Sequence, residues 1–186
     1  MSKKPTILVL FAHLSIRRSK INRAMVEAIR DLEHVVFRDL LEMYPDFYID
    51  VAEEQRALRS ADLLVLQHPI YWYSAPAIIT HWQDVVLTRG FAYGPGGTAL
   101  HGKEFMHAVS TGGPPDSYRE GGVHGYPLAE LLRPFEQMAR FCGMRAVPAL
   151  VLQGGHDLTD ATIAAHAQRY RELLERYRPG MSGGKA

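Results

Sequence analysis

Short apolar runs alternate along this chain with longer segments in which apolar residues recur at helical spacing. The first run, at 6–12, reads Thr-Ile-Leu-Val-Leu-Phe-Ala, and further runs lie at 35–37, 61–67, 105–110 and 146–152. A continuous apolar run of this length is typical of a strand that is buried on both faces. Strands that alternate with helices predict an α/β fold with a five-stranded parallel sheet, right-handed crossovers and helices on both faces.

The segments between these runs carry the helical pattern. Helices are predicted to begin at Ser19 and near Pro76, and to cover 52–59, 128–141 and 161–177. Serine is a favoured N-cap residue, and proline is tolerated in the first turn of a helix. Each predicted helix follows a predicted strand along the chain, and the strand at 35–37 is the shortest of these strands.

Length and composition fit one globular domain. With 186 residues and 47% hydrophobic composition, the chain can bury one core, and we expect a domain over 1–178 and a flexible tail over 179–186. The 21 basic and 20 acidic residues nearly balance, which argues against a nucleic-acid partner. Cys142 is the only cysteine, as expected in a reducing cytosol. The run at 6–12 is too short to span a membrane, so we expect a cytoplasmic protein.

Ligands of parallel α/β sheets bind in the crevice beyond the carboxyl ends of the strands, and three polar or glycine-rich loops follow predicted strands there. The first, at 13–22, joins a buried strand to a helix N-terminus, where free N–H groups and the helix dipole favour an anion. Hydroxyls at Ser15 and Ser19, with Arg17 or Arg18 nearby, suit a phosphate monoester. The alternative is that Ser19 is only an N-cap and that the arginines are solvated.

The second loop, at 68–76, carries three consecutive aromatic residues, Tyr71, Trp72 and Tyr73, between two prolines. A stiff aromatic surface of this kind can line a flat aromatic cofactor. The alternative is that these side chains pack beneath the next helix or against a second subunit.

The third loop combines a glycine turn with two side chains that can exchange protons near neutral pH. Ser-Thr-Gly-Gly at 110–113 is followed by Tyr118 and His124. Glycine lets the backbone approach a flat ligand, and tyrosine and histidine serve as acids and bases. The alternative is an ordinary turn with two surface residues. None of the nine histidines lies in an H-E-x-x-H pattern, so no metal site is predicted. No G-x-S-x-G motif of serine hydrolases and no G-x-G-x-x-G or Walker motif of nucleotide-binding proteins occurs either.

In this order, the segments resemble the NAD(P)H:quinone oxidoreductase family of flavodoxin-like flavoproteins, from about residue 7 to residue 177. The resemblance rests on 11–13 with Ser19 and Asn22, on 67–73, Trp82, 90–94 and 101–103, and on 111–125. Two stretches, 44–50 and 132–136, are most similar to the ancillary flavoproteins of bacterial glutathione-gated potassium efflux systems.

The resemblance implies a flavodoxin-like fold that binds a flavin, FMN rather than FAD, with NAD(P)H as electron donor. It assigns Tyr118 and His124 to a catalytic pair over the flavin ring. The implied flavin-binding residues are His13, Ser19, Lys20, Ile21 and Asn22 near the phosphate, and Ile70, Tyr71, Trp72, Tyr73, Ser110, Thr111, Gly112 and Gly113 along the ring. It also implies a homodimer in which 91–93 covers the partner's flavin. Leu14 departs from the pattern, because proline commonly follows this histidine, and this affects the expected cofactor affinity.

Two functions follow from the resemblance. The first is an NAD(P)H-dependent reductase that passes two electrons by hydride transfer to quinones or similar acceptors. The second is a flavin-bound regulatory subunit that binds a potassium efflux transporter, and so lies at the inner face of the membrane. A flavodoxin-like electron carrier is disfavoured, because the sequence has no strong acidic excess.

Overall fold

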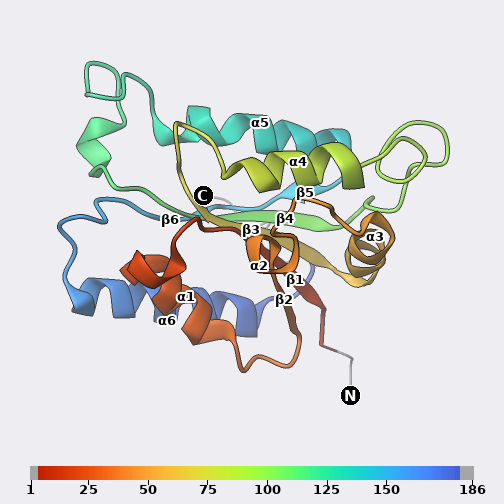
Figure 1. The fold of residues 1–186 in the computed structure, drawn as a ribbon, viewed down its shortest axis with the longest axis horizontal. Helices are drawn as coiled ribbons and strands as arrows, with labels where there is room; N and C mark the ends of the chain where they lie inside the picture. The colour runs from red at the N-terminus through yellow and green to blue at the C-terminus, as the bar shows by residue number, and fades with distance from the viewer. Residues whose placement is uncertain (1–3, 181–186) are drawn as a thin grey trace.

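The computed structural model describes residues 4–180 and has a parallel sheet at its centre (Figure 1). The strand order is β2-β1-β3-β4-β5, with β6 also paired to β4. Every printed pairing is parallel, as predicted. The strands are β1 (Ile7–Phe11), β2 (Val35–Asp39), β3 (Leu63–Pro69), β4 (Glu104–Ser110), β5 (Arg145–Ala146) and β6 (Leu150–Leu152).

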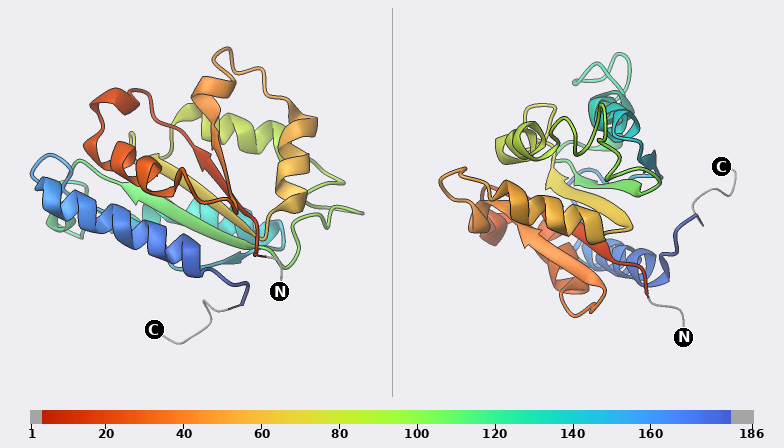
Figure 2. Two further views of the ribbon diagram at one scale, coloured as in Figure 1. Left: turned by 90° about the horizontal axis from the view of Figure 1, so that it is seen from below. Right: turned by 90° about the vertical axis from the view of Figure 1, so that its right-hand side faces the viewer.

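Helices cover both faces of the sheet (Figures 1 and 2). One face carries α1 (Lys20–Ile29) and α6 (Asp160–Arg176), and the other carries α4 (Ala77–Val86) and α5 (Leu128–Phe141). The remaining helices are α2 (Leu40–Met43), α3 (Val51–Ser60) and two short 3₁₀ turns, Ile16–Arg18 and Pro115–Ser117. The predicted doubly covered sheet is confirmed. No helix within 4–180 is long and apolar enough to cross a membrane.

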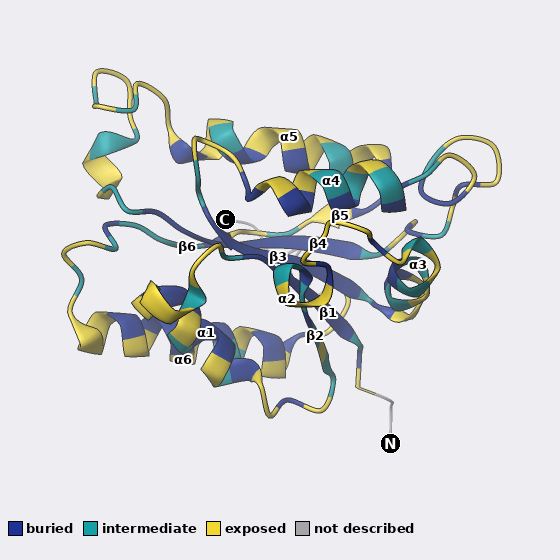
Figure 3. Ribbon diagram, viewed as in Figure 1, coloured by how far each residue is buried: buried dark blue, intermediate teal, exposed yellow. Residues whose placement is uncertain are grey.

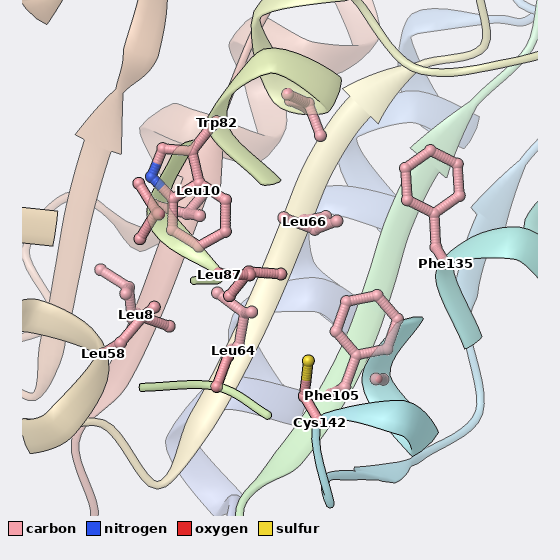
Figure 4. Packing of buried hydrophobic residues seen from close by; sticks show 14 of the residues in the cluster. Leu8, Leu10, Leu58, Leu64, Leu66, Trp82, Leu87, Phe105, Phe135 and Cys142 are labelled. Carbon is pink, nitrogen blue, oxygen red and sulfur yellow. The ribbon is translucent and has the colours of Figure 1, made fainter. Parts of the chain in front are cut away.

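The continuous apolar runs are strands because both of their faces are covered. All residues of β1, β3 and β4 are buried, whereas the edge strand β2 is mostly half-buried (Figure 3). Successive side chains point to opposite faces, so Leu8 and Leu10 pack with Trp82 and Phe135 in one cluster (Figure 4). Ile7 and Val9 point to the other face of the sheet and belong to the second cluster, which includes residues of α1 and α6.

A buried charged group joins α3 to its surroundings. The carboxylate of Glu54 is fully buried and accepts hydrogen bonds from Arg38 Nε at 2.9 Å, Tyr44 Oη at 2.7 Å and Trp82 Nε1 at 2.9 Å. Burial, and then the bond to Glu54, raise the pKa of Tyr44 to about 12. The network fixes α4 against β2 and α3, and α4 begins directly after the second loop.

The predicted strand at 146–152 is divided. β5 ends at Ala146 and β6 begins at Leu150, and the register against β4 shifts by one residue between them. Pro148 lies in the gap, and it has no N–H group with which to continue the ladder. The four-residue helix α2, capped by the side chain of Asp39, was not predicted. In the predicted tail, 181–186 lie outside the described residues, and Gly180 N donates to Glu104 Oε1 at 3.0 Å.

Candidate functional site

Four loops gather where the parallel strands end, at the left of Figure 1. The first loop (12–19) follows β1, the second (70–76) follows β3, the third (111–127) follows β4, and the fourth (153–159) follows β6. Because the strands are parallel, their carboxyl ends lie at the same edge of the sheet. The three loops expected from the sequence are therefore brought together, and the fourth joins them.

Ser19 and Asn22 connect α1 to the end of β4. Ser19 caps α1 by accepting a hydrogen bond from the backbone N–H of Asn22 at 3.1 Å. The Asn22 side chain is buried and donates to Ser19 Oγ at 3.3 Å and to Ser110 Oγ at 2.9 Å. The capping role of Ser19 is thus confirmed, and the cap also fixes the position of this helix end beside β4.

The start of α1 offers unused donors. The N–H groups of Lys20 and Ile21 stand in the first turn, where a helix supplies no internal acceptor. The Lys20 ammonium lies 3.0 Å from Asp160 Oδ1 at the start of α6, and both side chains are largely exposed. Arg17 and Arg18 are exposed in the turn before the cap. Backbone donors and positive charge at one helix end can hold a phosphate.

His13 joins the first loop to the second. Its Nδ1 accepts from the backbone N–H of Ser15 at 2.9 Å, so the ring proton of the neutral imidazole lies on Nε2. Nε2 is 3.3 Å from the Tyr71 hydroxyl, and the two rings meet edge to face with centroids 5.8 Å apart. Burial lowers the pKa of His13 and raises that of Tyr71, which keeps both groups neutral at pH 7.

The second loop is a tight turn with unusual backbone angles. Tyr71 and Ser74 exchange backbone hydrogen bonds of 2.9 and 3.0 Å. Between them, Trp72 and Tyr73 have φ angles of 48° and 67°, a left-handed conformation that costs on the order of 1–3 kcal/mol for such residues. The three aromatic side chains contact different neighbours instead of forming one surface: Tyr71 meets His13, Tyr73 meets His124 and Trp72 is 93% exposed.

The third loop brings Tyr118 and His124 into contact. Their rings are tilted by 30° with centroids 4.3 Å apart, and the Tyr73 ring meets His124 edge to face at 5.7 Å. A Cβ atom on Gly113 would lie 2.9 Å from His124 Nε2 and 3.3 Å from the Tyr118 ring. A side chain at this position would therefore require His124 to move, whereas glycine leaves the pair undisturbed. Thr111 fixes the turn, because its hydroxyl donates to the Gly113 carbonyl at 2.7 Å.

The fourth loop was missed in the sequence. Gly154 N donates to the Gly113 carbonyl at 2.8 Å, and Gly155 N donates to the Thr111 carbonyl at 2.9 Å. A Cβ on Gly112 would lie 2.6 Å from Nε2 of His156. The signal was available, because Gly-Gly-His directly follows the last strand and the carboxyl-end rule applies to that strand as well.

Three polar side-chain atoms around these loops are buried without a partner among the described residues. They are Asn22 Oδ1, His124 Nδ1 and Gln153 Nε2. Buried polar atoms are nearly always paired in folded proteins, so water or a ligand is expected to complete these three; other such atoms lie in the core, as at Gln67, His68 and His107, and these atoms alone do not mark the site. No cluster of three or more potential metal ligands occurs within 4–180.

Residues 5–174 match the family model described as the flavodoxin-like fold. The chain belongs to this family. Within the flavodoxin-like family, the chain is 42% identical over 175 residues to the glutathione-regulated potassium-efflux system ancillary protein KefG of Yersinia enterocolitica. The alignment covers 94% of this chain and 95% of that protein.

Two solved flavodoxin-like structures carry the same fold. General stress protein 14 of Treponema denticola, solved in complex with FMN, has a TM-score of 0.87 and 35% identity, and the match covers 92% of this chain and 98% of that one. An NADPH-quinone reductase from P. pentosaceus has a TM-score of 0.84 and 30% identity, and the match covers 93% and 99% of the two chains. The resemblance expected from the sequence is confirmed.

Proposed function

We propose that this protein is a flavin-dependent NAD(P)H oxidoreductase that passes two electrons to quinones or similar electron-poor acceptors. The observation that carries the proposal is the contact between the Tyr118 and His124 rings beside Gly113, at the edge of the sheet where α1 also begins. Support comes from the FMN complex of the Treponema denticola protein and from the NADPH-quinone reductase of P. pentosaceus.

The residues fit FMN. The capped start of α1, with Ser19, Lys20, Ile21 and Asn22, would take the phosphate. Gly112 and Gly113 let the imidazoles of His156 and His124 lie directly against the backbone of the third loop. The flavin ring would lie along Ile70, Tyr71, Trp72 and Tyr73 on one side and Ser110, Thr111, Gly112 and Gly113 on the other. His13 then acts by holding the first and second loops together through Tyr71.

When bound, FMN would supply the two-electron chemistry, while the chain supplies binding and electrostatics. The Tyr118 hydroxyl can donate a hydrogen bond where negative charge develops as the ring is reduced, and so can the imidazole of His124. The contact between the two tilted rings holds the groups together, and Tyr73 contacts His124 edge to face. Gly113 lets both groups approach without steric conflict.

The role of the pair is tested by rapid mixing of the FMN-loaded protein with NADPH or NADH in the absence of oxygen. Tyr118→Phe and His124→Gln are each expected to slow flavin reduction about 10- to 100-fold, because the first removes a donor aimed at developing charge and the second replaces the imidazole with an amide that cannot carry a positive charge. FMN binding should persist in both variants. Reduction at the wild-type rate in both would refute the assignment.

We also propose a homodimer with the active sites at its interface. Four apolar side chains in the first, second and third loops are strongly exposed: Leu14, Trp72, Val123 and Tyr126. The loop at 91–93 lies at the opposite edge of the sheet, but Phe91 and Ala92 are buried in the core and the Arg59 guanidinium lies 4.7 Å from the Phe91 ring, so these two side chains are not free to cover a partner's flavin. Sedimentation of Trp72→Ala against the wild type tests the interface, and an unchanged dimer dissociation constant would argue against it.

The second candidate function is that of an ancillary regulatory subunit of a potassium efflux transporter, in the cytoplasm and at the inner face of the membrane. It is favoured by the 42% identity to KefG. Reductase activity and a regulatory role are compatible, so activity does not decide between them. Co-purification with such a transporter would support the second function, and its failure under conditions that preserve the transporter would count against it.

A further inference from the structure

His156 occupies a defined position in the fourth loop, although its side chain is exposed. The two backbone bonds from Gly154 and Gly155 to the third loop hold this segment in place. Nε2 of His156 is the atom nearest to the position of a Cβ on Gly112, at 2.6 Å, and Nε2 of His124 is nearest to the equivalent position on Gly113, at 2.9 Å. Two imidazoles therefore lie against two successive glycines of the third loop.

Gly155, the residue directly before His156, packs close to α1. A Cβ on Gly155 would lie 3.0 Å from Cδ1 of Ile21 and 3.1 Å from the Thr111 carbonyl oxygen, so Gly155 sits between α1 and the third loop. The contact between Lys20 and Asp160 joins the starts of α1 and α6 in the same region. His156 therefore contacts Gly112 of the third loop and directly follows a residue that packs on Ile21, in the first turn of α1.

The other histidine of this region is already engaged. Both ring nitrogens of His13 are used, Nδ1 by the Ser15 N–H and Nε2 by Tyr71. Burial also lowers the pKa of His13, which disfavours a positive charge there. At the start of α1, the Lys20 ammonium contacts Asp160. In the fourth loop, His156 is the side chain that can bring a donor and a positive charge to an anion.

We propose that His156 binds the phosphate of FMN, as a further cofactor-binding residue contributed by the fourth loop. The inference rests on the proposed flavin function. An imidazole in this position would donate a charge-assisted hydrogen bond to a phosphate oxygen and complement the backbone donors of α1.

The test compares FMN with riboflavin, which has the same ring and ribityl chain but no phosphate. Dissociation constants are measured by quenching of flavin fluorescence for the wild type, His156→Ala and His156→Gln. His156→Ala is expected to weaken FMN binding about tenfold and to change riboflavin binding by less than about twofold, because only the charge-assisted bond is lost. His156→Gln, which keeps a donor without the charge, should recover part of the loss.

His81→Ala is the matched control, since it removes an imidazole from α4 that contacts the Phe47 carbonyl and none of the four loops. It should leave both constants unchanged. Equal weakening of FMN and riboflavin in His156→Ala would overturn the phosphate contact, and so would no change in either. Riboflavin binding also reports that the variant is folded. If the wild type binds neither flavin, the proposed function itself is refuted, and the inference fails with it.

Discussion

Replacing Glu54 with glutamine tests whether the buried network stabilises the fold as strongly as its geometry implies. The substitution keeps the shape of the side chain but removes its charge. The Glu54 carboxylate accepts from Arg38, Tyr44 and Trp82 at 2.7 to 2.9 Å, with no exposed surface of its own. A glutamine has one acceptor oxygen and one NH₂ group, so either the Trp82 indole or the Arg38 guanidinium faces a donor.

An unpaired buried donor costs about 1–3 kcal/mol, and breaking a buried ion pair costs about 3–5 kcal/mol. Arg38 keeps a contact with Glu53 at 3.3 Å, which places the expected loss near the lower end, about 3 kcal/mol. For a chain of this length, that corresponds to a fall in Tm of roughly 6–12 °C. The free energy of unfolding is measured by urea titration, followed by tryptophan fluorescence and circular dichroism.

Glu53→Gln is the matched control. Its carboxylate also contacts Arg38, but the Glu53 side chain is 41% exposed, so the expected loss is at most about 1 kcal/mol after solvent screening. If Glu54→Gln and Glu53→Gln lose equal stability, or if Glu54→Gln loses less than about 1 kcal/mol, the network does not act as a buried charged group.

Two further predictions concern pH and the glycine turn. Burial lowers the pKa of His68 to about 4, and burial followed by the nearby His68 lowers the pKa of His107 to about 3. Below pH 6.5 the unfolded chain therefore binds more protons than the folded chain. The free energy of unfolding should fall as the pH drops from 6.5 towards 4, by up to about 1.4 kcal/mol per pH unit for each histidine. Urea titrations at several pH values should show a smaller slope in His107→Leu, and an unchanged slope would contradict the assignment. Gly113→Ala should weaken FMN binding about tenfold, because the added Cβ meets His124 at 2.9 Å. The double variant Gly113→Ala with His124→Ala should recover part of this affinity. Equal losses of affinity in the single and the double variant would show that the steric conflict lies elsewhere.

The parallel sheet and its helices could be predicted because apolar runs and helical spacing are local properties of the sequence. The register shift at Pro148 depends on pairing with β4, a strand distant in the sequence. The burial of Glu54 depends on Arg38, Tyr44 and Trp82, which lie outside its own helix. The helix at 52–59 therefore looked polar, although Glu54 points into the core. The loops were found by the rule for carboxyl ends of strands, but which side chains meet there follows from left-handed turns and glycine contacts that no periodicity reveals.

The central claim is that this chain binds a flavin that NAD(P)H can reduce. The most direct measurement is the visible spectrum of the purified protein, followed by addition of NADPH or NADH in the absence of oxygen. We predict a yellow protein whose flavin absorbance bleaches with a nicotinamide donor. A protein that stays colourless after incubation with FMN and with FAD would contradict the account and leave only the fold.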